Sequence, residues 1–185
     1  YYKLFPNTFP NGSLGSPFLI DLKKLRKEYR TLQQENHPDI LHGSVQLTSS
    51  SPEEQADQTS MIINKAYSTL TSSLKRAQFL LKKNANIDLN DDDSTKDYQF
   101  KDKSLLMQIL EIHEELENIS NEEELNQLKI SNDERIANTE KKLDQLFKEK
   151  NYEDAALETV KLKYWFNIEN AIKNWEPGKA VNLTH

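Results

Sequence analysis

The sequence predicts an all-α protein, and three features of its composition and patterning lead to that fold class. Glycine and proline are scarce, at 4 and 6 of 185 residues, whereas leucine, lysine, glutamate and glutamine, which favour helices, are common. Runs of β-branched residues, which would indicate strands, are few. Apolar residues recur mainly at intervals of three and four, the spacing of one helix face. A chain of this length can form one domain or two small ones.

The first long helix is expected from Asp21, a suitable N-cap, to about Asn36. Its predicted buried face consists of four apolar residues at intervals of three and four: Leu22, Leu25, Tyr29 and Leu32. The helix should end at His37, because Pro38 disfavours the helical conformation of the residue before it.

A second helix is expected to begin at Ser51-Pro52-Glu53-Glu54, which combines a capping box with a proline at the first helical position. One of its faces carries Ala56, Ile63, Tyr67 and Leu70. A short third helix at about residues 74 to 83 would bring Leu74, Ala77 and Leu81 to the same core. The first domain is therefore predicted to span residues 1–83.

Residues 84–103 have weak periodicity and three consecutive aspartates, and they are predicted to form a flexible acidic linker. Three further helices, at about 104 to 118, 122 to 149 and 152 to 175, are separated by short polar breaks and suit an antiparallel bundle. Trp175-Glu176-Pro177-Gly178 should end the last of them. The second domain is therefore expected at residues 104–185.

Charge and composition argue against several classes of function. The net charge of -6, from 24 basic and 30 acidic residues, disfavours a general affinity for nucleic acid phosphates. The chain has no cysteine and 4 dispersed histidines, so neither a disulfide nor a zinc cluster is expected. The longest apolar runs fall far short of the roughly 20 residues that cross a bilayer. We therefore expect no metal, no cofactor, no nucleic acid and no membrane partner.

A candidate contact surface lies at the turn after the first long helix, where His37, Pro38 and Asp39 occupy a reversal of the chain. Chance alone would supply this tripeptide in roughly 1% of chains of this size, and its simplest interpretation is a helix terminator. The preceding helix, however, has one acid, Glu28, and five cations: Lys23, Lys24, Arg26, Lys27 and Arg30. These cations can form one electropositive ridge for an acidic partner, and a merely solvated face is the alternative.

Three segments resemble the J domain in order and spacing: residues 22–39, 63–70 and 74–81. The opening Tyr1-Tyr2-Lys3-Leu4-Phe5-Pro6 matches the short first helix of that domain. The Leu4-Phe5 start, the Asn64-Lys65-Ala66-Tyr67 segment and the Arg76-Ala77-x-Phe79-Leu80-Leu81 ending are similar to the HscB-type J-proteins of iron-sulfur cluster assembly. The resemblance extends over essentially the whole chain.

This resemblance implies an N-terminal J domain, built as a helical hairpin with short flanking helices, and a C-terminal three-helix bundle, L-shaped overall. It assigns His37, Pro38 and Asp39, with the basic helix before them, to binding a DnaK-class ATP-driven chaperone and stimulating its ATPase. The bundle would bind an iron-sulfur scaffold protein and deliver it to the chaperone, promoting cluster transfer. The protein itself would not be an enzyme. We expect a fungal-like protein of the mitochondrial matrix with its presequence removed, and the bacterial cytoplasm is the alternative location.

The helix at 104–118 has more apolar residues than one buried face requires. Leu105, Ile109, Ile112 and Leu116 form one stripe, and Leu106, Leu110 and His113 form a second. Either the bundle buries both stripes or one is left for a partner. The last helix has a similar surplus, in which Trp165 is expected in the core.

The HscB resemblance places Leu106 and Leu110 of the second stripe, with Leu105 nearby, and a tyrosine of the last helix against the scaffold. The predicted scaffold-binding residues are Leu105, Leu106, Leu110, Glu111, Glu114 and Tyr164. His113 is expected to be a partly exposed helix histidine rather than a metal ligand or a catalytic base.

Two alternatives remain open. An enzyme that uses His37 and Asp39 as an acid-base pair is disfavoured, because the sequence has no phosphate-binding loop, nucleophile motif or cofactor fingerprint. A J-domain adaptor with a different client, or with a C-terminal dimerisation module, fits the same helices.

Overall fold

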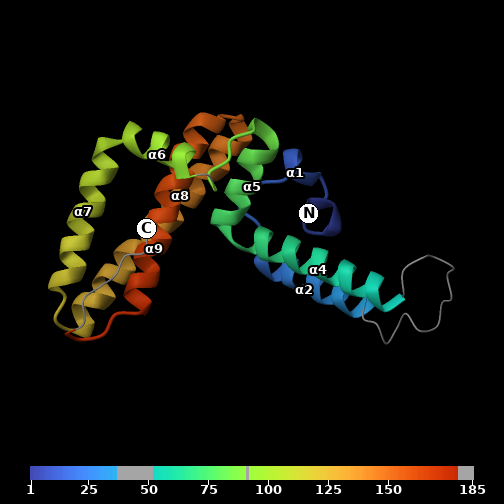
Figure 1. Ribbon diagram of the computed structural model, residues 1–185, viewed down its shortest axis with the longest axis horizontal. Coiled ribbons are helices and arrows are strands. Elements are labelled where there is room, and N and C mark those ends of the chain that lie inside the picture. The colour runs from blue at the N-terminus through green and yellow to red at the C-terminus, as the bar shows by residue number, and fades with distance from the viewer. Residues whose placement is uncertain (37–51, 91, 179–185) are drawn as a thin grey trace. The chain divides into compact units, whose positions relative to one another are not determined.

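The computed structural model describes residues 1–36, 52–90 and 92–178, and all regular structure in these ranges is helical (Figure 1). The predicted all-α class is therefore confirmed. The elements follow in this order: η1 (Tyr2–Leu4), α1 (Gly12–Gly15), α2 (Leu22–Glu35), α4 (Pro52–Thr71), α5 (Ser73–Ala85), α6 (Asp92–Lys101), α7 (Lys103–Asn118), α8 (Glu122–Glu149) and α9 (Tyr152–Lys173). Within the described ranges, none of these helices is both long enough and apolar enough to cross a membrane.

The contacts within the chain divide it into two compact units, residues 1–76 and 77–185. The division falls inside α5, earlier than the boundary that the sequence predicts at residue 83. Arg76 explains why the first unit ends there. Its buried guanidinium donates hydrogen bonds to the carbonyl oxygens of Phe18, at 3.0 Å, and Leu70, and so fastens the start of α5 to both segments.

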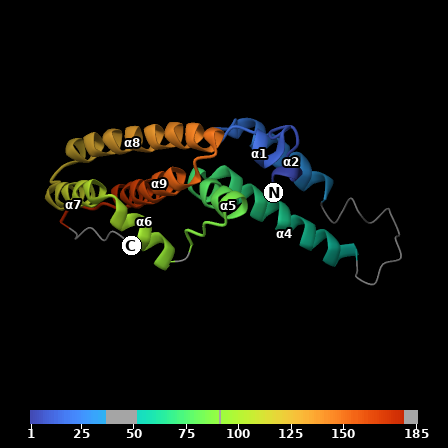
Figure 2. The same cartoon turned by 90° about the horizontal axis from the view of Figure 1, so that it is seen from above.

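In the first unit α2 lies along α4, as both views show (Figure 2). Asp21 caps α2 as predicted, since its Oδ1 accepts hydrogen bonds from the backbone amides of Lys23 and Lys24. The core combines residues of these helices with aromatic rings from the first 18 residues: Phe5, Phe9, Phe18, Leu25, Ile63, Ala66 and Leu70. The predicted face of α4 is thus confirmed at Ile63 and Leu70, while the side chain of Ala56 lies outside the described part.

The prediction that Leu22 belongs to the buried face of α2 is wrong. Leu22 is 51% exposed, because it is the first residue of the helix and precedes the region that packs on α4. Glu28 is buried in its place. The buried side of α2 therefore combines Leu25 with a carboxylate.

In the second unit α8 and α9 pack along each other, and α7 contacts α9 (Figure 1). The three helices agree with the bundle predicted from the sequence. The tight turn between α8 and α9 depends on Lys150, whose φ of 59° and ψ of 27° are left-handed. This conformation lets the Asn151 amide donate to the carbonyl oxygen of Leu146 at 2.9 Å, while the Asn151 side chain caps α9.

The predicted flexible acidic linker is wrong for residues 92–101, which form α6 and contact α7 and α9. The Tyr98 hydroxyl donates to Glu153 Oε2 at 3.1 Å. Thr95 is buried, and its hydroxyl donates to the carbonyl oxygen of Leu89 at 3.0 Å. Among the described side chains of α6, Thr95 and Tyr98 therefore help to dock the helix through polar contacts.

Candidate functional site

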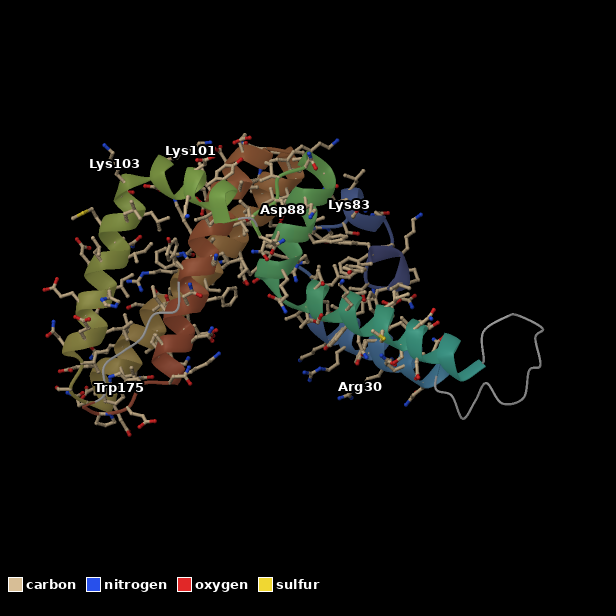
Figure 3. The ribbon with its side chains drawn as sticks, in the orientation of Figure 1. Arg30, Lys83, Asp88, Lys101, Lys103 and Trp175 are labelled. Carbon is tan, nitrogen blue, oxygen red and sulfur yellow. The ribbon has the colours of Figure 1, made fainter. Side chains whose placement is uncertain are left out.

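The cations of α2 lie on its solvent side. Lys23, Lys24, Arg26, Lys27 and Arg30 are all exposed. Lys23, Lys27 and Arg30 are four and three residues apart, which places them on the face opposite Leu25 and Leu32, and Arg30 projects outward from the helix (Figure 3). The electropositive ridge predicted from the sequence is thus geometrically possible along α2.

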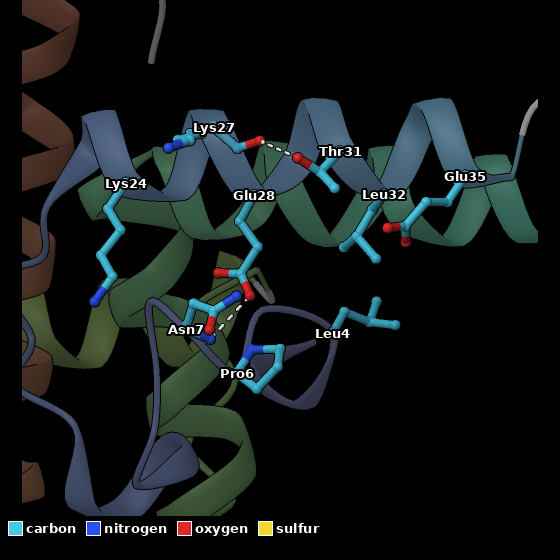
Figure 4. A pocket seen from close by; sticks show the side chains of 9 residues that line it. All are labelled: Leu4, Pro6, Asn7, Lys24, Lys27, Glu28, Thr31, Leu32 and Glu35. Atoms are coloured by element: carbon cyan, nitrogen blue, oxygen red, sulfur yellow. Dashed lines mark hydrogen bonds between the residues drawn. The ribbon is translucent and has the colours of Figure 1, made fainter.

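Glu28, the acid counted within this ridge, points away from it. Its carboxylate accepts a hydrogen bond from the Asn7 amide at 2.9 Å (Figure 4). It also accepts hydrogen bonds from the Thr8 amide at 2.9 Å and the Thr8 hydroxyl at 2.7 Å. The negative charge of Glu28 is therefore held against the N-terminal segment, and the outer face of α2 is more positive than the sequence count suggests.

The N-terminal segment and α2 also enclose a shallow pocket between them (Figure 4). Its lining mixes apolar, basic and acidic side chains: Leu4, Pro6, Asn7, Lys24, Lys27, Glu28, Thr31, Leu32 and Glu35. Lys24 and Lys27 stand at this pocket, beside Glu28. Because both signs of charge line it, the pocket does not point to one class of small ligand.

A polar and aromatic seam holds α2 against α4. The rings of Tyr29 and Tyr67 stack with centroids 4.0 Å apart and planes 13° from parallel. Asn64 Oδ1 accepts hydrogen bonds from the Tyr29 hydroxyl and from Gln33 Nε2, each at 2.7 Å. Ser60 completes the seam by donating to Gln33 Oε1 at 3.0 Å. The seam fixes the half of α2 that leads toward residue 37.

The predicted chaperone-contact residues His37, Pro38 and Asp39 lie outside the described residues. The helix before them ends at Glu35, close to the predicted position. Asn36 Nδ2 donates to the carbonyl oxygen of Leu32 at 2.7 Å and satisfies one of the last carbonyls of α2.

The two apolar stripes of α7 have different environments. Leu105, Ile112 and Leu116 are buried, whereas Leu110 is 63% exposed. The alternative in which the bundle buries both stripes is therefore wrong. Leu105 was predicted among the scaffold contacts, but only 3% of it is exposed, so it supports the core and is not available at the surface.

The exposed side of α7 carries an apolar surface that we call the α7 outer patch, formed by Leu106, Met107 and Leu110. Leu106 is half-buried, and Met107 is 59% exposed. Sequence reasoning missed Met107, although its position three residues before Leu110 was a usable signal. The exposed carboxylates of Glu111 and Glu114 border the patch. An apolar patch with an acidic border suits a protein partner that carries apolar and basic groups.

Two neighbouring aromatic residues of α9 have separate roles. Trp165 is buried, as predicted, and its Nε1 donates to Thr139 Oγ1 of α8 at 3.1 Å. Asn132 Nδ2 of α8 donates to the Trp165 carbonyl oxygen at 2.8 Å. Tyr164 is half-buried and thus presents part of its ring to solvent.

An ion pair links the N-terminus of α7 to the middle of α9. Lys161 Nζ of α9 lies 3.1 Å from Oδ2 of Asp102, the N-cap residue of α7. The start of α7, marked by Lys103, and the end of α9, marked by Trp175, lie at opposite ends of the bundle (Figure 3). From the ion pair onward, α7 and α9 therefore run in the same direction. Leu106 follows Asp102 by four residues and Tyr164 follows Lys161 by three, about one helical turn in each case. Leu106 and Tyr164 are thus each about one helical turn beyond the residues of the ion pair.

The surroundings of Asp102 and Lys161 shift both pKa values toward the ionised forms. A hydrogen bond from the Ser104 hydroxyl and a second from Lys161 lower the pKa of Asp102 from 3.8 to about 2. Burial alone lowers the pKa of Lys161, but hydrogen bonds to Asp102 and Glu158 and their negative charges outweigh it and raise the pKa. Both groups are thus charged at neutral pH.

The described residues do not converge on a catalytic or metal-binding arrangement. His113 is half-buried, and its Nδ1 lies 3.5 Å from Glu117 Oε1 in the next turn of α7. Within the described ranges no group of three or more His, Cys, Asp or Glu side chains could hold a metal ion. The surfaces described above are suited to binding other proteins.

Comparisons with known proteins relate both units to one group of chains. The family model described as the HSCB C-terminal oligomerisation domain matches residues 101–173. The mitochondrial J-type co-chaperone JAC1 of Saccharomyces cerevisiae is 38% identical over 100% of this chain and 93% of its own length. The iron-sulfur cluster co-chaperone protein HscB of Homo sapiens is 29% identical over 84% of this chain and 63% of its own length. The solved structure of the Jac1 co-chaperone from Saccharomyces cerevisiae matches with a TM-score of 0.78 and 40% identity, over 98% of this chain and 96% of that one.

Proposed function

This chain belongs to the HscB and Jac1 family of J-type co-chaperones, and from that premise we propose that it connects two proteins during iron-sulfur cluster biogenesis. The first unit binds a DnaK-class chaperone and stimulates its ATPase. The second unit binds the iron-sulfur scaffold protein and delivers it to that chaperone, which promotes cluster transfer. The chain contributes binding surfaces and carries out no chemistry of its own.

The chaperone contact consists of His37, Pro38 and Asp39 together with the cations of α2. Support comes from the exposure of all five cations and from the burial of Glu28, which leaves the outer face of α2 positive. Such a face attracts an acidic surface and orients it toward the residues that follow the helix. The partner surface on the chaperone is therefore acidic.

The observation that carries the client assignment is the exposure of the α7 outer patch. Leu110 and Met107 are each more than half exposed although α7 already buries Leu105, Ile112 and Leu116 against the bundle. We propose that the patch and Tyr164, which lies about one turn beyond the same ion pair as Leu106, form a small anchor cluster from two helices. Glu111 and Glu114 border it and favour a client with basic residues.

The proposed location is the mitochondrial matrix. Its support is that the relatives of Saccharomyces cerevisiae and Schizosaccharomyces pombe are both described as mitochondrial J-type co-chaperones.

Two opposite variants of the full chain test this function. Simultaneous Leu106→Ala, Leu110→Ala and Tyr164→Ala substitutions should abolish scaffold binding, because each anchor contributes roughly 1 to 3 kcal/mol. The same protein should still stimulate the chaperone ATPase in the absence of scaffold. His37→Gln should produce the reverse pattern. Scaffold affinity is measured by calorimetry and stimulation by phosphate release.

A matched control replaces an exposed apolar residue elsewhere in the second unit. Ile130 of α8 is 52% exposed, and Ile130→Ala should leave both measurements unchanged. Unchanged scaffold affinity in the triple variant would refute the client site, and full ATPase stimulation by His37→Gln would refute the chaperone contact.

A second candidate function makes the bundle a dimerisation module. It is favoured by the description of the matching family model as an oligomerisation domain. Sedimentation of the chain alone distinguishes the two, since a monomer that binds scaffold supports the client site. A dimer that the triple substitution dissociates would assign the same patch to a second copy of the chain.

A further inference from the structure

A network of four charged side chains, Lys142, Glu158, Lys161 and Asp102, connects all three helices of the bundle. Glu158 of α9 is buried, and its Oε1 lies 2.5 Å from Lys142 Nζ of α8 and 3.2 Å from Lys161 Nζ. Lys161 extends this network to Asp102 at the start of α7. The positive end of Lys161 is thus shared between α9 and the N-terminus of α7.

Asp102 uses its two carboxylate oxygens for different purposes. Oδ1 accepts hydrogen bonds from the backbone amides of Ser104 and Leu105, each at 3.1 Å, and from the Ser104 hydroxyl at 2.6 Å. Oδ2 faces Lys161 at 3.1 Å. One side chain therefore begins α7 and attaches it to α9.

The position of this attachment matters because the proposed client surface is divided between two helices. Leu106 lies on α7 and Tyr164 on α9, each about one turn beyond the ion pair. A movement of the α7 N-terminus along or around α9 would change the separation of these two anchors. Affinity depends on anchors that are already held in their bound arrangement.

We infer that Asp102 and Lys161 are positioning residues for client binding, because their ion pair fixes Leu106 of α7 relative to Tyr164 of α9. The inference rests on the proposed function of the second unit and assigns these two residues a role within it. They act through the anchor residues. Glu158 holds Lys161 in place from the side of α9.

The test compares substitutions that remove charge and preserve shape. Asp102→Asn keeps an efficient N-cap, because asparagine caps helices as well as aspartate, but it removes the ion pair. Lys161→Met removes the cation and keeps the length of the side chain. Each should weaken scaffold binding about fivefold to tenfold, and the double variant should be no weaker than either single variant, because both disrupt one interaction. Lys161→Arg should keep the scaffold affinity within about twofold of that of the unmodified protein, because arginine can pair with both carboxylates.

Two controls make the result specific. Lys129→Met breaks an exposed ion pair that lies within α8 alone, where Nζ is 2.7 Å from Asp133 Oδ2 one turn along the helix, and it should leave affinity unchanged. Leu110→Ala should weaken binding in the same assay. Urea unfolding of each variant verifies that the protein is folded at the assay temperature.

Each outcome of the assay decides between distinct explanations. Full affinity in Asp102→Asn with reduced affinity in Leu110→Ala would overturn the positioning role and leave the client site intact. Additive losses in Asp102→Asn and Lys161→Met would also overturn it, because they would mean that Lys161 contacts the scaffold directly. Full affinity in Leu110→Ala would overturn the client site and the positioning role together.

Discussion

The carboxylate of Asp102 makes part of the stability of the second unit depend on pH. Its pKa in the folded protein is about 2, below the ordinary value of 3.8, chiefly because of the Ser104 hydroxyl and then Lys161. A carboxylate with a lowered folded pKa stabilises the protein fully above its unfolded pKa, and this contribution is lost as the pH falls through the folded pKa. The contribution of Asp102 is therefore present near neutral pH and disappears between about pH 4 and pH 2.

Asp102→Asn should remove this dependence, since asparagine does not titrate. The difference in free energy of unfolding between the unmodified protein and the variant should be constant near neutral pH and shrink as the pH falls from 3.8 toward 2. Urea unfolding across this range measures it. Ser104→Ala removes the largest cause of the shift and raises the folded pKa of Asp102, so in that background the contribution of Asp102 should be smaller and its loss complete at a higher pH. If the free energies of unfolding of the unmodified protein and of Asp102→Asn differed by the same amount at all pH values, Asp102 would not be the source of the pH dependence.

Two other residues show what sequence patterning cannot resolve at this scale. The charge of Glu28 follows from its sequence, but its hydrogen bonds to Asn7 and Thr8 depend on how a distant loop returns to α2. Met107 is flexible and tolerates burial or exposure, so only the packing of α7 determines its environment. The burial of Leu25 on α2 and of Leu116 on α7 was predictable, because strict apolar spacing specifies a buried face.

Among the helices and their connections, the turn between α8 and α9 carries a conformational cost. Lys150 is left-handed, a conformation that is unfavourable for residues with a Cβ atom and acceptable for glycine. Lys150→Gly should therefore stabilise the protein, by about 0.5 to 1 kcal/mol after the greater freedom of glycine in the unfolded chain is subtracted. The midpoint of urea unfolding should rise.

Lys150→Ala is the matched control for that substitution. Alanine removes the same lysine side chain but keeps a Cβ atom in the left-handed conformation, so the midpoint should not rise. Equal stabilisation by glycine and alanine would attribute the effect to the lost lysine charge instead of the backbone.

The long helices were predictable from sequence, whereas α6 was not. Helices α2, α7, α8 and α9 begin at side chains that cap them, such as Asp21 and Asn121, and most have a periodic apolar face. Helix α6 instead docks through Tyr98 and Thr95, whose partners lie on α9 and in the preceding loop. Tertiary contacts of this kind leave no periodic signal in the segment itself.

For the whole molecule, the two units are expected to work only when they belong to one chain. His37→Gln retains the proposed client surface, and the Leu106, Leu110 and Tyr164 triple alanine variant retains the proposed chaperone contact. A mixture of the two at micromolar concentration should not restore the ATPase stimulation that depends on scaffold. Linkage within a chain gives effective concentrations of roughly millimolar, far above those in the mixture.

The measurement is phosphate release by the chaperone with scaffold present, for each variant alone and for the mixture. The unmodified protein at the same total concentration is the positive control. Restored stimulation in the mixture would mean that delivery does not require one chain, and it would favour association of two copies through the bundle.

The two tryptophans confine the intrinsic tryptophan fluorescence of the protein to its second unit. Both tryptophans, Trp165 and Trp175, belong to the second unit, and the aromatic residues of the first unit are all tyrosine and phenylalanine. Excitation at the red edge of the protein absorption band selects tryptophan, so emission from the intact chain reports on the second unit alone. Trp165 is hydrogen-bonded to Thr139 and its ring centroid lies 5.8 Å from the Arg135 guanidinium, so in a Trp175→Phe variant the emission should report the packing of α8 on α9 without any added label.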